Sequence, residues 1–330
     1  MRAAIVGISG MALTAGEAAL LRALPPAGVI LFGRNVGDRG QLVSLTAALL
    51  AVLPAGAVVM VDQEGGRVAR LRPPQWRGHP TAAVIGQVFE RDVAAGLRAA
   101  WLQGALIGLD CAAAGFSMVA APVLDLAVAG THAVIGDRAF SASPDAVARL
   151  GRAMAAGLLA AGVVPVGKHA PGHGRALVDS HLSLPVVEGA DLDGDILPFA
   201  RNADLPAMMT AHILYPALDP VFPATLSAGI ISQVIRGRIG FRGLLMSDDL
   251  AMEALNGTPA ERALGCLAAG CDVALYCPGD EQGTRAVLEA VPEMALDAAT
   301  RLADAVALAR SRRLPLDADR LDDERGILLS

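Results

Sequence analysis

His169, His173 and His181 are three of only six histidines in this 330-residue chain, and they fall in one glycine-rich stretch. The same stretch carries Lys168 and Asp179. Because each glycine loosens the backbone, the stretch is unsuited to a regular helix or strand and predicts a loop. Imidazole titrates near neutral pH, so histidines gathered in such a loop indicate either proton transfer or metal binding.

Polar side chains also follow five separate apolar runs that we interpret as strands. They are Asp62, Asp125, Lys168 with His169, His212, and Ser247 with Asp248 and Asp249. In a parallel barrel the active site lies at the carboxyl ends of the strands. A charge at the end of a buried strand is costly unless it is paired or used. These positions therefore predict one shared active site.

Strands and helices alternate along the chain. Short apolar runs predict eight strands, at 4–7, 28–32, 58–61, 117–121, 164–168, 207–210, 244–246 and 273–276. Amphipathic patterns predict helices that include 41–52, 93–107, 144–161, 228–238 and 259–269. The third helix has clear boundaries, because Ser143 suits the cap, Pro144 the first position and Gly162 the stop.

This alternation predicts an α/β protein, a single (β/α)8 TIM-type barrel. The strands are continuous apolar runs, which is typical of strands buried on both faces. No Gly-x-Gly-x-x-Gly follows the first strand, so a dinucleotide-binding fold is disfavoured. We expect one catalytic domain over 1–330, in which 311–330 forms a charged surface tail.

Composition limits the possible partners and compartment. The chain is 54% hydrophobic with a net charge of −6, and it has no basic face for nucleic acid. No apolar run approaches the ~20 residues of a membrane span, and the first residues do not resemble a signal peptide. The four cysteines form no Cys-x-x-Cys pair, which disfavours a zinc site and fits reduced core residues. We expect a cytoplasmic protein that binds neither nucleic acid nor membrane.

The polar residues also have structural interpretations. Asp248 and Asp249 could each cap the helix after their strand. The remaining interpretations are Glu64 as the partner of an arginine, Asp125 as a turn residue, His173 as a loop-shaping residue, His79 and His132 as solvated residues, and Arg67, Arg70 and Arg138 as ordinary ion-pair members.

The chain resembles a known family at several motifs. Lys-His-x-Pro-Gly-His-Gly from Lys168, then Asp-Ser-His from Asp179, is similar to the signature of bacterial β-N-acetylglucosaminidases of glycoside hydrolase family 3. Further similar segments occur in the family's order at 30–35, 61–68, 121–125, 134–138 and 243–250. Ala170 stands where the family commonly has Phe, Ala139 where it often has Ser, and a less polar spacer occupies 175–178. None of these differences removes a group that the chemistry needs.

The resemblance implies a retaining hydrolase with no cofactor and no metal. It assigns Asp248 as the nucleophile, His181 as the general acid/base and Asp179 as the partner of His181. The residues it assigns to the terminal sugar are Asp62, Arg70, Arg138, Lys168 and His169. Members of the family act in the cytosol on peptidoglycan fragments and release GlcNAc from GlcNAc-1,6-anhydro-N-acetylmuramic acid, with or without its peptide. We therefore expect a small muropeptide or amino-sugar substrate, and a monomer.

These assignments are chemically reasonable. An imidazole with a pKa of ~6.5 can both donate and recover a proton near neutral pH. Asp179 and His181 are two positions apart, so in an extended segment their side chains point the same way and the carboxylate can orient the imidazole. We expect Pro171 to Gly174 to form the flexible neck of this loop. Two Trp and two Tyr are few for a polysaccharide groove and favour a pocket for one terminal sugar.

Two other functions stay open at this point. A metal-dependent barrel hydrolase could use His169, His173, His181, His212 and Asp248 as ligands. Against it, no His-x-His follows an early strand, and Lys168 would bring a positive charge to the metal. A non-catalytic sugar-binding barrel would explain Asp62 and the arginines but would leave the pairing of Asp179 and His181 with Asp248 without a purpose.

Overall fold

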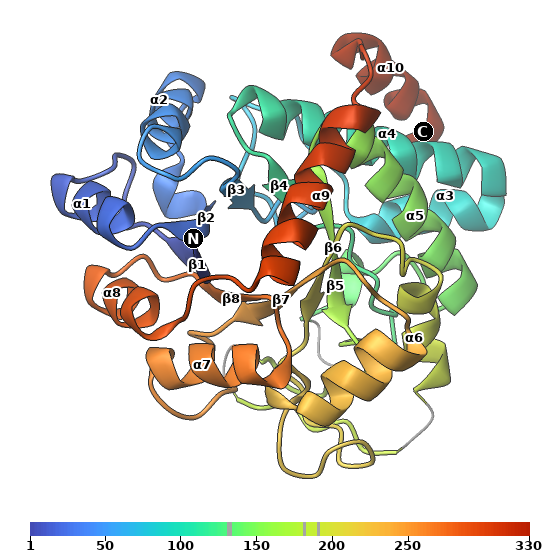
Figure 1. The fold of residues 1–330 in the computed structure, drawn as a ribbon. Helices are drawn as coiled ribbons and strands as arrows, with labels where there is room; N and C mark the ends of the chain where they lie inside the picture. Colours follow the sequence, from blue (N-terminus) through green and yellow to red (C-terminus); the bar gives the residue numbers. More distant parts are fainter. Residues whose placement is uncertain (131–133, 181–182, 190–191) are drawn as a thin grey trace.

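The computed structural model describes the whole chain except residues 131–133, 181–182 and 190–191. Its strands are β1 (Arg2–Gly7), β2 (Pro26–Leu31), β3 (Val58–Val61), β4 (Met118–Val119), β5 (Val164–Ala170), β6 (Ala207–Thr210), β7 (Leu244–Asp249) and β8 (Val273–Tyr276). Each strand pairs in parallel with the next, and β1 pairs with β8 to close the barrel (Figure 1). The predicted (β/α)8 barrel is confirmed.

The strands are apolar over most of their length because alternate residues face two different apolar environments. Ile5, Ile30 and Met60 belong to the layer inside the barrel. Their neighbours Val6 and Val29 belong to the core between the strands and the surrounding helices. Successive side chains of a strand point to opposite faces, so a strand buried on both sides has no polar position.

The strand boundaries differ from the predicted ones where polar residues continue an extended backbone. β5 and β7 run past their apolar runs to Ala170 and Asp249. β4 is shorter than the predicted 117–121, although Ala120 N still donates to Val61 O at 2.9 Å and Val166 N to Ala121 O at 2.9 Å. The chemically active residues are therefore parts of the strands or directly attached to them, which is how a rigid barrel positions them.

Helices surround the barrel (Figure 1). They are α1 (Ala15–Ala23), α2 (Arg39–Leu50), α3 (Ala82–Arg91), α4 (Val93–Ala113), α5 (Pro144–Ala160), α6 (Asp193–Ala200), α7 (Pro259–Ala269), α8 (Glu281–Ala290), α9 (Leu296–Arg312) and α10 (Ala318–Leu329). The predicted helix at 228–238 is a π-helix at Ile230–Arg238. Ser143 caps α5 as predicted, and Thr258 with Glu261 forms a capping box at α7.

Helix α9 closes one end of the barrel. Its side chains Leu302, Ala305 and Ala309 join the layer inside the barrel. Figure 1 shows α9 lying across the strands. Because Met1 and Gly56, which precede β1 and β3, lie beside α9, this is the amino-terminal end of the strands. The opposite end is left for the active site.

The segment predicted as a charged surface tail is largely helical. Helix α9 extends to Arg312, and α10 packs on α3 and α4 (Figure 1). Leu321 of α10 is buried against Leu102 and Leu106 of α4, and Arg325 is also buried. Most residues of the segment are exposed, as expected of a charged surface tail, but the helix and its packing were not predicted. α10 has a narrow apolar stripe among many charges, and only its contact with α4 shows which side is buried.

All four cysteines are free and buried, as predicted. Among the described residues, no helix has the length and apolar character needed to cross a bilayer.

Candidate active site

A cavity of about 170 Å³ opens at the carboxyl ends of the strands. Seven of the eight predicted site residues line it: Asp62, Arg70, Arg138, Lys168, His169, Asp179 and Asp248. The eighth, His181, lies outside the described residues. Pockets for drug-sized ligands are typically ~300–1,000 Å³, so this cavity suits one small polar molecule rather than a long chain.

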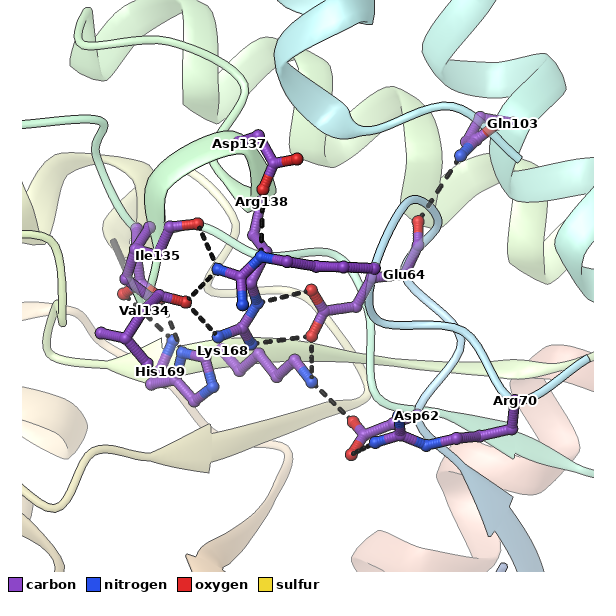
Figure 2. Close-up of polar contacts among 12 residues, drawn as sticks. Asp62, Glu64, Arg70, Gln103, Val134, Ile135, Asp137, Arg138, Lys168 and His169 are labelled. Atoms are coloured by element: carbon purple, nitrogen blue, oxygen red, sulfur yellow. Dashed lines mark hydrogen bonds and ion pairs between the residues drawn. The ribbon is translucent and has the colours of Figure 1, made fainter. Parts of the chain in front are cut away.

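The floor of the cavity is a network of ion pairs centred on Glu64 (Figure 2). Arg138 meets Glu64 with two parallel hydrogen bonds of 2.8 Å each. Lys168 Nζ lies 2.7 Å from Glu64 Oε1 and 2.7 Å from Asp62 Oδ1. Arg70 then reaches Asp62 Oδ2 at 3.4 Å. Glu64 is thus the partner of an arginine, as its structural interpretation held, but it also holds Lys168.

The network keeps its charges despite being buried. Burial alone would raise the pKa of Glu64, but the charges of Lys168 and Arg138 hold it well below its ordinary value. Burial alone would lower the pKa of Lys168, but Asp62 and Glu64 raise it above its ordinary value. Buried charges are tolerated when each has a partner of opposite charge, and every charged group of this network has at least one. Asp62, Arg70 and Lys168 therefore present fixed acceptors and donors to the cavity.

Arg67 lines the edge of the cavity and shares the acceptor Val134 O with Arg138. It pairs with Asp137 at 3.2 Å, and both side chains are 47% exposed. Its Nη2 also donates to Val134 O at 2.7 Å. The interpretation of Arg67 as an ion-pair member is confirmed, and its exposed position leaves it accessible from the solvent side of the cavity.

Asp248 is placed and ionised as a nucleophile would require. It is the penultimate residue of β7 and lines the cavity together with Lys168 and His169. Burial would raise the pKa of Asp248, but His169, His212 and the N–H of Asp249 lower it to about 2. That N–H donates to Asp248 Oδ1 at 2.8 Å. The carboxylate is therefore negative across the physiological pH range.

The helix-cap interpretation of Asp248 and Asp249 is wrong. The next helix, α7, begins ten residues after Asp249 at Pro259 and is capped by Thr258. Asp249 Oδ1 instead accepts from the backbone N–H groups of Ala251 and Cys277, at 3.0 Å each. His212 Nε2 contacts Asp249 O at 2.9 Å. These contacts fix the end of β7, and so fix the direction of Asp248.

Asp125 organises the start of the histidine loop. Its Oδ2 lies 2.6 Å from His169 Nδ1, and its Oδ1 accepts from the backbone N–H of His173 at 2.7 Å. The charge is stable there: burial would raise the pKa of Asp125, but His169 and His173 lower it. Asp125 is more than a turn residue, because it orients one histidine of the cavity and holds the backbone that carries the next.

The neck at Pro171 to Gly174 is not loose, contrary to the sequence analysis. All four residues are buried, and the hydroxyl of Tyr215 donates to Gly172 O. A Cβ on Gly174 would lie 2.3 Å from Leu126 O. The glycines therefore permit close packing rather than movement. His173 is buried as well, with Nε2 3.1 Å from Ser180 Oγ. This contact connects the neck to the part of the loop that carries Ser180.

The buried histidines predict a loss of stability in mild acid. Burial and the charge of His169 lower the pKa of His173 to about 4, whereas an unfolded histidine has a pKa of ~6.5. Between these values the unfolded chain binds the proton and the folded chain does not, so stability is complete above pH 6.5 and falls toward pH 4. His173 alone should remove about 2 kcal/mol of unfolding free energy between pH 7 and pH 5.

Urea unfolding at pH 7, 6 and 5 measures this loss. Burial also lowers the pKa of His79 and His212, which act in the same direction. The variant His173→Gln should show a shallower fall than the wild type over the same range, whatever its stability at pH 7. Parallel curves would contradict the assignment of the loss to His173.

The ring nitrogens bear on the metal hypothesis. His212 is engaged at both nitrogens, with Thr225 Oγ1 at 2.8 Å and Asp249 O at 2.9 Å. His169 Nδ1 and His173 Nε2 contact Asp125 and Ser180. Within the described part of the chain, no three His, Cys, Asp or Glu side chains are arranged to hold a metal ion. Four of the five residues named as possible ligands are hydrogen-bonded to protein groups, and His212 is engaged through both ring nitrogens, whereas His169 and His173 are each engaged through one.

Two histidines outside the loop had been interpreted as solvated. His79 is not: its side chain is only 1% exposed and lies against Asp110 and Arg325. His132 lies outside the described residues. Sequence reasoning also missed Gln103, a buried residue of α4 that contacts the turn after Glu64 (Figure 2). No local pattern marks it, because a glutamine within an apolar helix face has no distinguishing spacing.

Comparison with known proteins agrees with this geometry. Residues 6–308 match the model of the glycosyl hydrolase family 3 N-terminal domain. The chain is 42% identical over 300 residues to a β-hexosaminidase of Alkalilimnicola ehrlichii, which covers 88% of this chain and 84% of that protein. It is 41% identical over 316 residues to a β-hexosaminidase of Thioalkalivibrio sulfidiphilus, covering 94% and 88%.

Solved structures show the same relationship. NagZ from Neisseria gonorrhoeae in complex with N-trifluoroacetyl-D-glucosamine superposes with a TM-score of 0.87 at 33% identity, covering 100% of this chain and 98% of that one. The same protein in complex with a zinc ion superposes with a TM-score of 0.86 at 32% identity, covering 100% and 98%. The family model matches most of this chain, and the two curated relatives align with it over most of both sequences. This chain therefore belongs to glycosyl hydrolase family 3.

Proposed function

We propose that the chain is a retaining exo-β-N-acetylglucosaminidase that removes a terminal, non-reducing β-linked GlcNAc. The observation that carries the proposal is the ionised Asp248 at the end of β7, in one small cavity with Asp62, Lys168 and Asp179. The names of the curated relatives and the amino-sugar derivative bound to gonococcal NagZ support the choice of sugar.

In the proposed reaction Asp248 attacks the anomeric carbon of the sugar. The bond to the aglycone oxygen breaks, and that oxygen takes a proton from His181. A covalent glycosyl-enzyme results, with the sugar on the Asp248 oxygen. In the second step the now neutral His181 accepts a proton from water while that water attacks the same carbon. Asp248 leaves, and the two inversions give net retention.

Asp179 is the proposed partner of the acid. It lines the cavity at intermediate exposure on the segment that leads to His181. A carboxylate beside an imidazole selects its tautomer and stabilises its protonated form, so the acid can be charged when substrate arrives.

The remaining lining residues are proposed to hold the sugar. Asp62 can accept hydrogen bonds from sugar hydroxyls, while Arg70 and Lys168 can donate to them. Their mutual contacts fix them before substrate binds, which lowers the cost of ordering them on binding. Arg138 is committed to Glu64 and to Val134 O, so we assign it mainly to holding the floor of the cavity.

The shape of the site favours one sugar and a small aglycone. Among the described residues that line the cavity, none is Trp, Tyr or Phe. The two tyrosines are occupied elsewhere, by Gly172 O and by Asp280. A groove for a long polysaccharide would need stacking rings that this site does not offer.

We propose GlcNAc-1,6-anhydro-N-acetylmuramic acid, with or without its peptide, as the natural substrate, and turnover of peptidoglycan fragments as the role. The muramic acid and the peptide are anionic, and the exposed guanidinium of Arg67 at the cavity edge has the complementary charge. We place the enzyme in the cytoplasm as a single-domain monomer, a proposal that four free cysteines support, because thiols stay reduced there.

The test is hydrolysis of an aryl β-GlcNAc by the purified chain. We expect turnover, with the β-anomer of GlcNAc as the first product, and the same rate after treatment with a chelator. The zinc-bound form of gonococcal NagZ makes the chelator arm necessary. Activity that a chelator removes and zinc restores would favour the metal-dependent hydrolase, and binding of GlcNAc without turnover would favour the sugar-binding barrel.

A further inference from the structure

The turn that carries Glu64 is supported from outside the cavity. Gly65 has a φ of +112°, and a Cβ there would lie 2.3 Å from Pro80 O and 2.6 Å from Gln103 Nε2. The next N–H, that of Gly66, donates to His79 O at 2.9 Å. The turn is therefore packed directly on the segment 78–80 and on one side chain of α4. Any displacement of these groups would move Glu64.

Gln103 contacts both the Glu64 turn and the 78–80 segment. Figure 2 shows its contact with Glu64 O. Its Nε2 donates to Pro80 O at 3.0 Å and lies 3.5 Å from Glu64 O. Its Oε1 accepts from Arg325 Nη1 at 2.9 Å. Gln103 is 1% exposed, so water could not replace any of these hydrogen bonds if it were lost.

Arg325 holds the outer side of this support. It lies on α10, 5% exposed, and its guanidinium reaches three groups besides Gln103. Nη1 contacts His79 Nδ1 at 2.9 Å, and Nη2 donates to Gly78 O at 3.0 Å and to Asp322 at 2.7 Å. One planar group therefore fixes both His79 and Gln103, which in turn contact the Glu64 turn. A rigid fork with several donors suits this task, whereas a lysine would supply one flexible point charge.

We propose that Arg325 is a positioning residue for the sugar-binding floor, acting on Glu64 through Gln103 and the 78–80 segment. This inference rests on the proposed function, because Glu64 holds Lys168 and Arg138 in the cavity where the sugar is proposed to bind. It gives α10 a role in substrate binding although the helix lies outside the barrel, packed on α3 and α4 (Figure 1).

The alternative is that Arg325 only attaches α10 to the barrel. The chain offers a matched control for that alternative. Arg98 of α4 meets Glu324 of α10 with bonds of 2.6 and 2.8 Å, so it also fastens α10 to α4. It contacts neither Gln103 nor the 78–80 segment in the contacts that the structure describes. The variant Arg98→Met therefore weakens the docking of α10 without touching the support of Glu64.

The experiment compares Arg325→Met with Arg98→Met on an aryl β-GlcNAc. We expect Arg325→Met to raise KM on the order of tenfold with kcat within about twofold, because an interaction that holds sugar equally in ground and transition states affects KM. Arg325→Lys should fall between the wild type and Arg325→Met. Arg98→Met should leave KM unchanged even where it lowers the melting temperature.

A double-mutant cycle tests the route of the effect. If Arg325 acts through Glu64, the KM changes of Arg325→Met and Glu64→Gln will be less than additive when combined. Additive changes, or an unchanged KM in Arg325→Met, would overturn the inference. If Arg325→Met does not fold, Arg325→Lys replaces it, because one ammonium group cannot reach Gln103, His79 and Gly78 O together. An unchanged KM in that variant would overturn the inference. An inactive wild type would instead reject the proposed function.

Discussion

Replacing Asp248 by asparagine is expected to lower kcat on an aryl β-GlcNAc by on the order of 10³-fold or more. The amide has nearly the same shape and its oxygen can still accept the N–H of Asp249. It carries no negative charge, however, and cannot form the glycosyl ester. Because the variant leaves Asp62 and Lys168, the residues proposed to hold the sugar, unchanged, substrate affinity should change little.

Steady-state kinetics with urea unfolding as a check on folding measures this effect. The control is Asp204→Asn, which removes a carboxylate that is 69% exposed and pairs only at the surface with Arg152. It should keep the wild-type kcat. A second variant, Asp248→Gly, leaves space for a small anion, and azide should then restore turnover with the α-glycosyl azide as product. An Asp248→Asn enzyme with nearly wild-type kcat would remove Asp248 from the role of nucleophile.

Replacing His181 by alanine should affect two substrates very differently. A sugar leaving group needs a proton as its bond breaks, so kcat/KM for a disaccharide should fall by on the order of 10²- to 10⁴-fold. An activated aryl leaving group needs little protonation, so its kcat/KM should fall by about tenfold or less. The ratio kcat/KM is the right quantity because it reports the first irreversible step, in which the leaving group departs.

Variants of Asp179 and His79 complete the His181 experiment. Asp179→Asn should show the same selectivity between the two substrates with a smaller loss, because it removes the orientation of the acid and not the acid itself. His79→Gln changes a histidine that does not line the cavity, and it should show no such selectivity, whatever its effect on KM. Equal losses on both substrates in His181→Ala would assign the proton to another group.

The fold could be predicted from sequence because its rules are local. Each strand had to be apolar on both faces, and Ser143, Pro144 and Gly162 mark the ends of α5 without any tertiary information. The helical packing of α10 was not predicted, because half of its residues are charged. The burial of Leu321 depends on Leu102 and Leu106, which are more than 200 residues away in sequence. The buried side of a helix with a narrow apolar stripe can be identified only when its packing partner is known.

The candidate site was also predictable only in part. The position of a residue at a strand end is a local property, and it placed Asp62, Lys168, His169 and Asp248 in one cavity. The partners of these residues are not local. Nothing near Glu64 in sequence shows that it joins Lys168 to Arg138. Glycine was also ambiguous, since Gly172 and Gly174 were expected to loosen the neck and instead allow close packing.

The pairing of β1 with β8 has a consequence for any attempt to divide this protein. A closed sheet has no free edge, whereas a chain cut between two strands would expose two rows of unpaired backbone groups that invite aggregation. Contacts between the first and last strands span most of the sequence, so the barrel can close only after nearly all of the chain is available. The cavity draws its residues from β5 and β7 and from the segments that follow β3, β4 and β5. It therefore cannot be isolated as a fragment, and it forms together with the barrel as a whole.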